Sequence, residues 1–290
     1  MSSANSQTAT DTDTSNAGPL ASKPTPLSIQ ESEQGNPPAH AARFACIDLC
    51  NFDCIRLANF TASEIADVNR VITENWHKGI RKSRRYGESC EIQLYGLSWM
   101  GSASGHDESR LLVLRILENL YNKGWMLQSA VNIIKEQKGK EKTDRERTWP
   151  FQVLFLQRLT IHPDSLVFRK QVTVPPPCHW ITISFDSYGK LKIINSPPPD
   201  LVAAVLRLFK LKIRQQEVTG DRLKIKLGTS AWASTGPHAV KTQLKLLSLL
   251  ETLESCGFSL YATLGTENER DVLICYRRQG WIQGAPVMHR

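Results

Sequence analysis

The sequence predicts an α+β protein built from two pseudo-symmetric ββαβαββ repeats, each with a mostly antiparallel sheet and its helices on one face. The first observation behind this prediction is internal similarity, because residues 68–130 align without a gap with residues 201–263. The second is periodicity, since short alternating apolar runs indicate strands and longer runs at helical spacing indicate helices. The third is a run of prolines at 175–177, which favours an extended linker. We expect the copies to pack with pseudo-twofold symmetry.

The alignment also sets the domain boundaries. Equivalent residues lie 133 positions apart, and the offset becomes 136 in the first hairpin. Paired positions include Ile92 and Ile225, Trp99 and Trp232, Glu118 and Glu251, and Gly124 and Gly257. The first repeat therefore spans residues 44–172 and the second residues 179–278, joined by a proline linker at 173–178. Residues 1–43 lack the aliphatic residues of a core and are expected to be a disordered tail, and residues 279–290 form a C-terminal tail.

Each element has a local signal. The first repeat is expected to contain strands at 44–49 and 55–58, a helix from Thr61 through Trp76, a strand at 90–94, a helix at about 107–123, and a closing hairpin of 125–134 with 166–169. The second repeat is expected to contain strands at 180–185 and 191–194, a helix from Pro199 through Phe209, a strand at 223–227, a helix at about 240–256, and a closing hairpin of 258–264 with 272–276. Thr61 and Glu64 form a capping box, whereas Gly124 and Gly257 are typical left-handed helix terminators.

The first repeat carries an insertion of 26 residues, at about 135–161, that the second repeat lacks. Its first half is strongly charged, whereas residues 149–159 are apolar without a counterpart. Long insertions inside a hairpin are usually functional loops or additions outside the core. A gene-model artefact, such as retained intron sequence, is the third alternative.

Composition restricts the class of protein. The chain has 290 residues, of which 41% are hydrophobic and 22% charged, as is usual for globular proteins. No apolar run is long enough for a membrane helix, and the first residues lack the features of a secretory signal. Seven cysteines, an odd number in a long chain, fit reduced thiols. We therefore expect an intracellular protein, cytoplasmic or nuclear, without membrane insertion.

The formal net charge is +8, and cations gather after the first helix of each repeat. Such clusters can neutralise phosphates of a nucleic acid or another polyanion. The candidate polyanion-binding residues are Lys78, Arg81, Lys82, Arg84, Arg85, Lys210, Lys212 and Arg214. No recognised nucleic-acid module accompanies them, so a solvated loop following an amphipathic helix is the competing interpretation.

Small-residue loops precede the second helix of each repeat. Free backbone amides at a helix start can hold an anion, and the candidates for such a role are Ser102, Ser104, Ser234 and Thr235. The loops lack the lysine of a phosphate-binding loop, and Ser104 or Thr235 is equally explained as an N-cap.

The sequence predicts no metal site, catalytic residue or cofactor. Cys46, Cys50 and Cys54 are spaced by four without a histidine pair, which is not a zinc-binding spacing. Cys178 and His179 are neighbours on an extended chain, so their side chains point apart. Paired carboxylates and nucleophile motifs are also missing from the sequence.

Three segments resemble a family of uncharacterised intracellular eukaryotic proteins built from the same duplicated unit. These segments are Ile92–Trp99, Leu114–Trp125 and Asp164–Arg169, and the resemblance extends over residues 44–278. It implies the fold, because the motifs are a strand, a Gly-capped helix and a hairpin. It implies no activity and no site residues.

A duplicated unit without a catalytic constellation favours a non-catalytic binding or adaptor protein with a protein partner. Nucleic-acid or phosphate-rich partner binding through the basic stretches is the alternative. A small-ligand carrier or an enzyme of unknown class is the second alternative. The sequence leaves the oligomeric state open.

Overall fold

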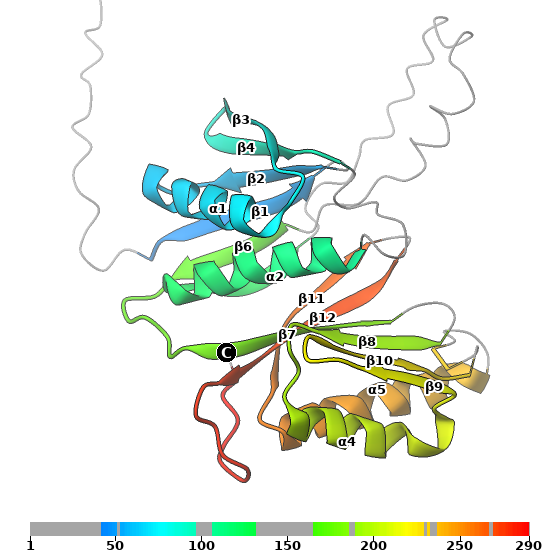
Figure 1. The fold of residues 1–290 in the computed structure, drawn as a ribbon. Coiled ribbons are helices and arrows are strands. Elements are labelled where there is room, and N and C mark those ends of the chain that lie inside the picture. Colours follow the sequence, from blue (N-terminus) through cyan, green and yellow to red (C-terminus); the bar gives the residue numbers. More distant parts are fainter. Residues whose placement is uncertain are drawn as a thin grey trace, which may run out of the picture. The chain divides into compact units, whose positions relative to one another are not determined.

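The computed structural model describes residues 42–50, 53–96, 106–131, 165–185, 189–228, 231–232, 237–266 and 269–289. Within these residues the chain forms two six-stranded antiparallel sheets and four α-helices (Figure 1). The α+β class and the two-repeat organisation predicted from the sequence are therefore confirmed. The predictions for the N-terminal tail before residue 42 and for the insertion lie outside the described residues.

The first repeat forms a sheet with the strand order β3-β4-β2-β1-β6-β5. Its elements are β1 (Phe44–Cys50), β2 (Cys54–Ala58), α1 (Ala62–Asn75), β3 (Ile80–Tyr86), β4 (Ser89–Leu94), α2 (His106–Asn122), β5 (Trp125–Val131) and β6 (Ser165–Lys170). Apolar residues on one face of the central strands, such as Ile47, Ile55 and Ile92, are buried in one core with residues of α1 and α2. This is the arrangement that the alternation of the strands predicts.

The second repeat has the same strand order once each strand is replaced by its counterpart, β9-β10-β8-β7-β12-β11. Its elements are β7 (Cys178–Phe185), β8 (Lys190–Ile194), α4 (Pro199–Phe209), η2 (Lys210–Lys212), β9 (Gln215–Val218), β10 (Arg222–Lys226), α5 (Pro237–Ser255), β11 (Ser259–Thr266) and β12 (Glu269–Arg278). Ile183, Ile193 and Ile225 line the core that this sheet shares with α4 and α5. Cys178, expected in the linker, is the first residue of β7.

Each repeat contains one strand more than the sequence predicted, so the unit is ββαββαββ. The additional strands are β3 and β9, and both are sheet edges. β3 carries Arg81, Lys82, Arg84 and Arg85 of the first basic stretch, which is therefore an edge strand rather than a solvated loop. In the second repeat the candidate cations Lys210, Lys212 and Arg214 lie in η2 and just before β9. The two strands were missed because an edge strand exposed on both faces needs no apolar alternation, and cations commonly protect such edges from further pairing. All four residues of β9 are exposed.

The helix signals are confirmed. The Thr61 hydroxyl accepts a hydrogen bond from the Glu64 amide at 3.3 Å, and the Glu64 carboxylate accepts one from the Thr61 amide at 2.9 Å. Gly124 and Gly257 follow α2 and α5 with φ values of +81° and +79°. The left-handed conformation at these ends is the one that glycine adopts without steric cost.

Glu64 also ties the start of the first repeat to the closing hairpin. Its carboxylate accepts hydrogen bonds from Arg43 at 2.8 Å, Lys170 at 3.2 Å and the Trp125 indole at 3.0 Å. Burial alone would raise the pKa of Glu64, but these donors and the Thr61 amide lower it to about 2. Arg43, which the sequence prediction placed in the tail, is thus part of the folded unit.

The C-terminal residues fold back onto the second repeat. The Trp281 indole donates to the Ala285 carbonyl at 3.1 Å, and the Trp281 ring lies against Gly257. Met288 is partly buried against the first core. The segment predicted as a tail is therefore attached to the fold through residue 289.

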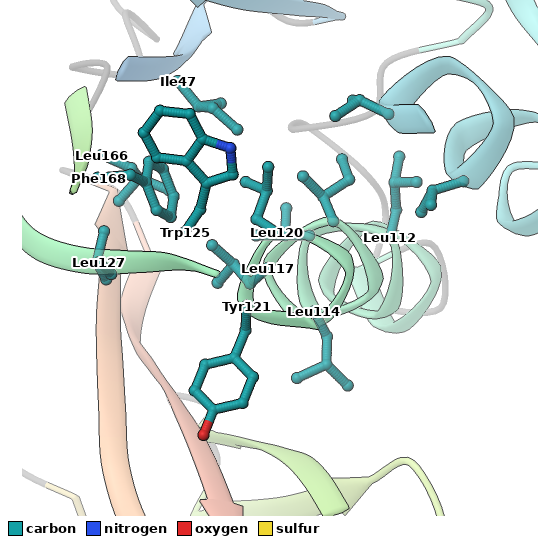
Figure 2. Close-up of a cluster of buried hydrophobic side chains, with 14 of the residues drawn as sticks. Ile47, Leu112, Leu114, Leu117, Leu120, Tyr121, Trp125, Leu127, Leu166 and Phe168 are labelled. Atoms are coloured by element: carbon teal, nitrogen blue, oxygen red, sulfur yellow. The ribbon is translucent and has the colours of Figure 1, made fainter. Parts of the chain in front are cut away.

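The two repeats meet through α2, which is apolar on two sides. Leu112 and Leu120 point to the first sheet, whereas Leu114 and Tyr121 point the opposite way, toward the second repeat (Figure 2). The Tyr121 ring lies 5.2 Å from Trp180 of β7, 6.0 Å from Tyr261 of β11 and 5.8 Å from Tyr276 of β12, measured between centroids. Edge-to-face aromatic contacts of this kind add to the energy of burial.

Polar contacts surround this aromatic contact between the repeats. Asp107 of α2 pairs with Lys192 of β8 at 3.1 Å, and Arg115 donates to Asn195 at 2.7 Å. Helix α2 of the first repeat therefore packs on one face of the second sheet, and α4 and α5 cover the opposite face of that sheet. Such a contact joins two different surfaces, so the predicted pseudo-twofold packing is wrong.

Candidate functional site

The basic stretch of the first repeat lies on the edge strand β3 and the turn before it. Arg81 contacts Asp53 at 3.4 Å and donates to Gln93 at 3.0 Å, and the Lys78 ammonium lies 5.3 Å from the Trp76 ring. Lys82 and Arg85 are exposed, and neither has an ion-pair partner among the described residues. The strand therefore offers fewer uncompensated cations than the sequence indicates.

Arg84 is held by a nearly buried carboxylate on the neighbouring strand. Glu91 of β4 is 3% exposed and lies between Arg84 at 2.7 Å and Arg56 of β2 at 3.2 Å. Burial would raise the pKa of Glu91, but the two guanidinium groups lower it. Arg84 is thus paired within a row of three charged residues on β2, β4 and β3. The sequence analysis did not foresee this pairing because its members lie on separate strands.

The corresponding cations of the second repeat lie near the end of α4. Lys210 and Lys212 form η2, and Arg214 precedes β9. Within the described chain none of the three has an ion-pair partner. This cluster lies next to the second sheet, whereas β3 is an edge strand of the first sheet. Ser102, Ser104, Ser234 and Thr235 lie outside the described residues.

The cysteines form no group with three potential metal ligands in the part of the chain that the structure describes. Cys50 and Cys54 face each other across β1 and β2, with their sulfur atoms 3.0 Å apart. Burial, followed by the nearby Asp48, raises the pKa of Cys46 to about 12, which keeps that thiol protonated. All seven cysteines are free thiols.

The outer face of α5 presents an apolar stripe, Val240, Leu244 and Leu247, hereafter the α5 stripe. These side chains are 59%, 58% and 53% exposed, although they follow one another at helical spacing. A helix face of this kind is normally buried, and an exposed apolar patch marks a site of interaction. The stripe is the first functional candidate that the sequence analysis missed.

The equivalent face of α2 is the one that contacts the second sheet. At the offset of 133, Leu247 corresponds to Leu114, which is fully buried, and Val240 corresponds to Asp107, which pairs with Lys192. The same helix face is thus occupied in the first repeat and exposed in the second. The alignment pairs these residues, but only the packing of α2 shows that this helix face contacts a neighbouring sheet in the first repeat.

A cavity of about 470 Å³ lies beside the α5 stripe, between the end of α4 and the first half of α5. Phe209, Leu227 and Leu244 contribute apolar walls, and the side chains of Lys212, Lys241 and Lys245 contribute cationic ones. The Lys245 ammonium donates to the Ala231 carbonyl at 2.6 Å and lies 5.9 Å from the Trp232 ring. We call this cavity of about 470 Å³ the lysine cavity. Of its lysines, only Lys212 was among the sequence-predicted candidates.

Comparison with known proteins gives one family. The model of an uncharacterised domain family matches two segments, residues 43–152 and 179–276, one in each repeat. The chain belongs to this family. The resemblance to an uncharacterised duplicated family is therefore confirmed, and the family brings a fold without an assigned activity. Neither the curated proteins nor the solved structures contain a match.

None of the helices among the described residues combines the length and the apolar character that a membrane-spanning helix needs.

Proposed function

We propose that this protein is a non-catalytic binding protein that docks a protein partner on the α5 stripe. The observation that carries the proposal is the internal comparison: the face that α2 buries against a neighbouring sheet is exposed on α5. Exposing three large aliphatic side chains in a row costs solubility unless a partner covers them. The free thiols favour a reducing compartment, so we place this function in the cytoplasm or nucleus.

The chemistry of the partner follows from the surroundings of the stripe. Lys212 and Lys241 lie beside it without an ion pair among the described residues, and Lys210 is exposed nearby on η2. A matching surface has an apolar centre and an acidic rim, since complementary charge speeds association and excludes wrong partners. The proposed partner is therefore an acidic protein.

Polyanion binding remains the competing function, favoured by the same unpaired lysines. It predicts capture that depends on nucleic acid and on the cations of β3 as well as η2. Docking on the α5 stripe predicts capture that depends on apolar contact and persists after nuclease treatment.

A position-dependent cross-linking experiment separates these alternatives. A photoreactive residue replaces Leu244, Leu247 or, as a control, Val172, which is apolar and 99% exposed and lies just before the proline linker, outside the α5 stripe. We expect one discrete protein adduct from both α5 positions, resistant to nuclease, and none from Val172. Adding Val240→Asp should abolish the adduct. The same products from Val172, or no product from α5, would contradict the proposal.

A further inference from the structure

The lysine cavity has the size and the lining of a small-molecule site. Its volume of about 470 Å³ falls within the range of ligand pockets, roughly 300 to 1,000 Å³. One side is apolar, formed by Phe209, Leu227 and Leu244, and the three ammonium groups come from η2 and α5. Pockets of this composition bind molecules that are partly apolar and carry the opposite charge.

The charges of the cavity are not balanced within the described chain. Lys212, Lys241 and Lys245 have no carboxylate partner there, and the hydrogen bond from Lys245 goes to a neutral carbonyl. Burial, followed by the repulsion of Lys212 and Lys241, lowers the pKa of Lys245. Three ammonium groups that line one cavity without a carboxylate partner gain from an anion placed between them.

The first repeat shows that the fold does not require these lysines. Lys245 stands where the first repeat has Leu112, which is fully buried in the core. Lys241 corresponds to Glu108, which lies 3.5 Å from His77, and Lys212 corresponds to Gly79. The second repeat thus has three cations at positions where the first has a buried leucine, a carboxylate and a glycine.

We propose that the lysine cavity binds an organic anion, with its charged group held by Lys212, Lys241 and Lys245 and its apolar body against Phe209, Leu227 and Leu244. Alkyl phosphates and fatty carboxylates share these two features, because each has an anionic headgroup and an apolar chain. The cavity adjoins the α5 stripe and shares Leu244 with it. It goes beyond the proposed protein docking because its apolar wall includes Phe209 and Leu227, which are core residues of the second repeat, and because Lys245 lines it.

Isothermal titration of the full chain at low ionic strength tests the proposal with octyl phosphate, octanoate, inorganic phosphate and neutral octyl glucoside. We expect one site that binds octyl phosphate or octanoate at least tenfold more tightly than inorganic phosphate or octyl glucoside. The tighter of the two amphiphiles identifies the headgroup. Equal binding of inorganic phosphate, equal binding of octyl glucoside, or no binding of either amphiphile would overturn the proposal.

Variants place the binding in the cavity. Lys245→Leu restores the residue of the first repeat and should keep the fold while lowering affinity at least tenfold, and Lys241→Gln, on the exposed side, should lower it several-fold. Lys82→Leu on β3 and Leu247→Asn on the α5 stripe are matched controls that should leave affinity unchanged. Loss of affinity in Leu247→Asn but not in Lys245→Leu would show association with the stripe and contradict the cavity site.

Discussion

Leu114 and Leu247 provide a matched test of the packing between the repeats. They are equivalent residues on equivalent helices, but Leu114 is fully buried toward the second sheet and Leu247 is 53% exposed. Removing a buried leucine side chain costs the transfer of its methyl groups and leaves a cavity, so Leu114→Ala should lower the free energy of unfolding by about 3 kcal/mol. Leu247→Ala should lower it by less than about 0.5 kcal/mol, as is usual at exposed positions.

Urea denaturation followed by tryptophan fluorescence measures both values. One cooperative transition is expected, because residues of both repeats lie in the first core. In a thermal scan Leu114→Ala should lower the Tm by roughly 6 to 12 °C, at about 2 to 4 °C per kcal/mol for a domain of this size. Equal losses in the two variants would refute the reasoning, since the two faces would then be equally buried.

The remaining predictions concern a glycine and a carboxylate. Gly257→Ala should lower the free energy of unfolding by about 2 to 4 kcal/mol, because a Cβ there would overlap the Trp281 ring at a φ of +79°. Gly124→Ala meets only the Gln171 carbonyl at 3.5 Å and should lower it by about 1 kcal/mol. Denaturation measures both losses, and adding Trp281→Ala should recover part of the first and none of the second. Glu64→Gln should cost roughly 2 kcal/mol at pH 7, discounted for solvent screening. The pKa of Glu64 is lowered from 4.5 to about 2 on folding, so the charged carboxylate stabilises the fold above pH 4.5 and this contribution fades as the pH falls toward 2. Wild type and variant should therefore converge in acid, and a constant difference across pH 2 to 7 would contradict the ion network.

The elements with local signals were predictable from the sequence. Thr61 and Glu64 fix the start of α1 through contacts three residues apart, and Gly124 fixes the end of α2 through its own backbone conformation. β3 was not predictable in this way, because its cations lack apolar alternation and its strand character comes from pairing with β4. Local patterns indicate what a segment prefers, whereas an edge strand is defined by its neighbour.

The candidate site depends on contacts between distant residues, which the sequence alone does not show. The sequence predicted a helix at about 107–123, but it did not reveal that Leu114 and Tyr121 of this helix contact the second repeat. Lys245 could have been noticed as the one charged residue opposite a core leucine in the alignment. Its meaning depends on Lys212 and Phe209, which lie in other elements and join it only in the folded chain.

The contact between the repeats leaves two outer surfaces of different character. A stack of two units that joins a helix layer to a sheet face leaves one sheet face and one helix layer unused. The unused sheet face carries Asp48, Arg56, Glu91 and Arg84 on adjacent strands, where directly opposed charges compensate one another across the sheet. Terminal units of stacked proteins need such a polar outer face to stay soluble. The unused helix layer carries the exposed α5 stripe instead, which is why we propose α5, rather than the outer sheet face, as the docking surface.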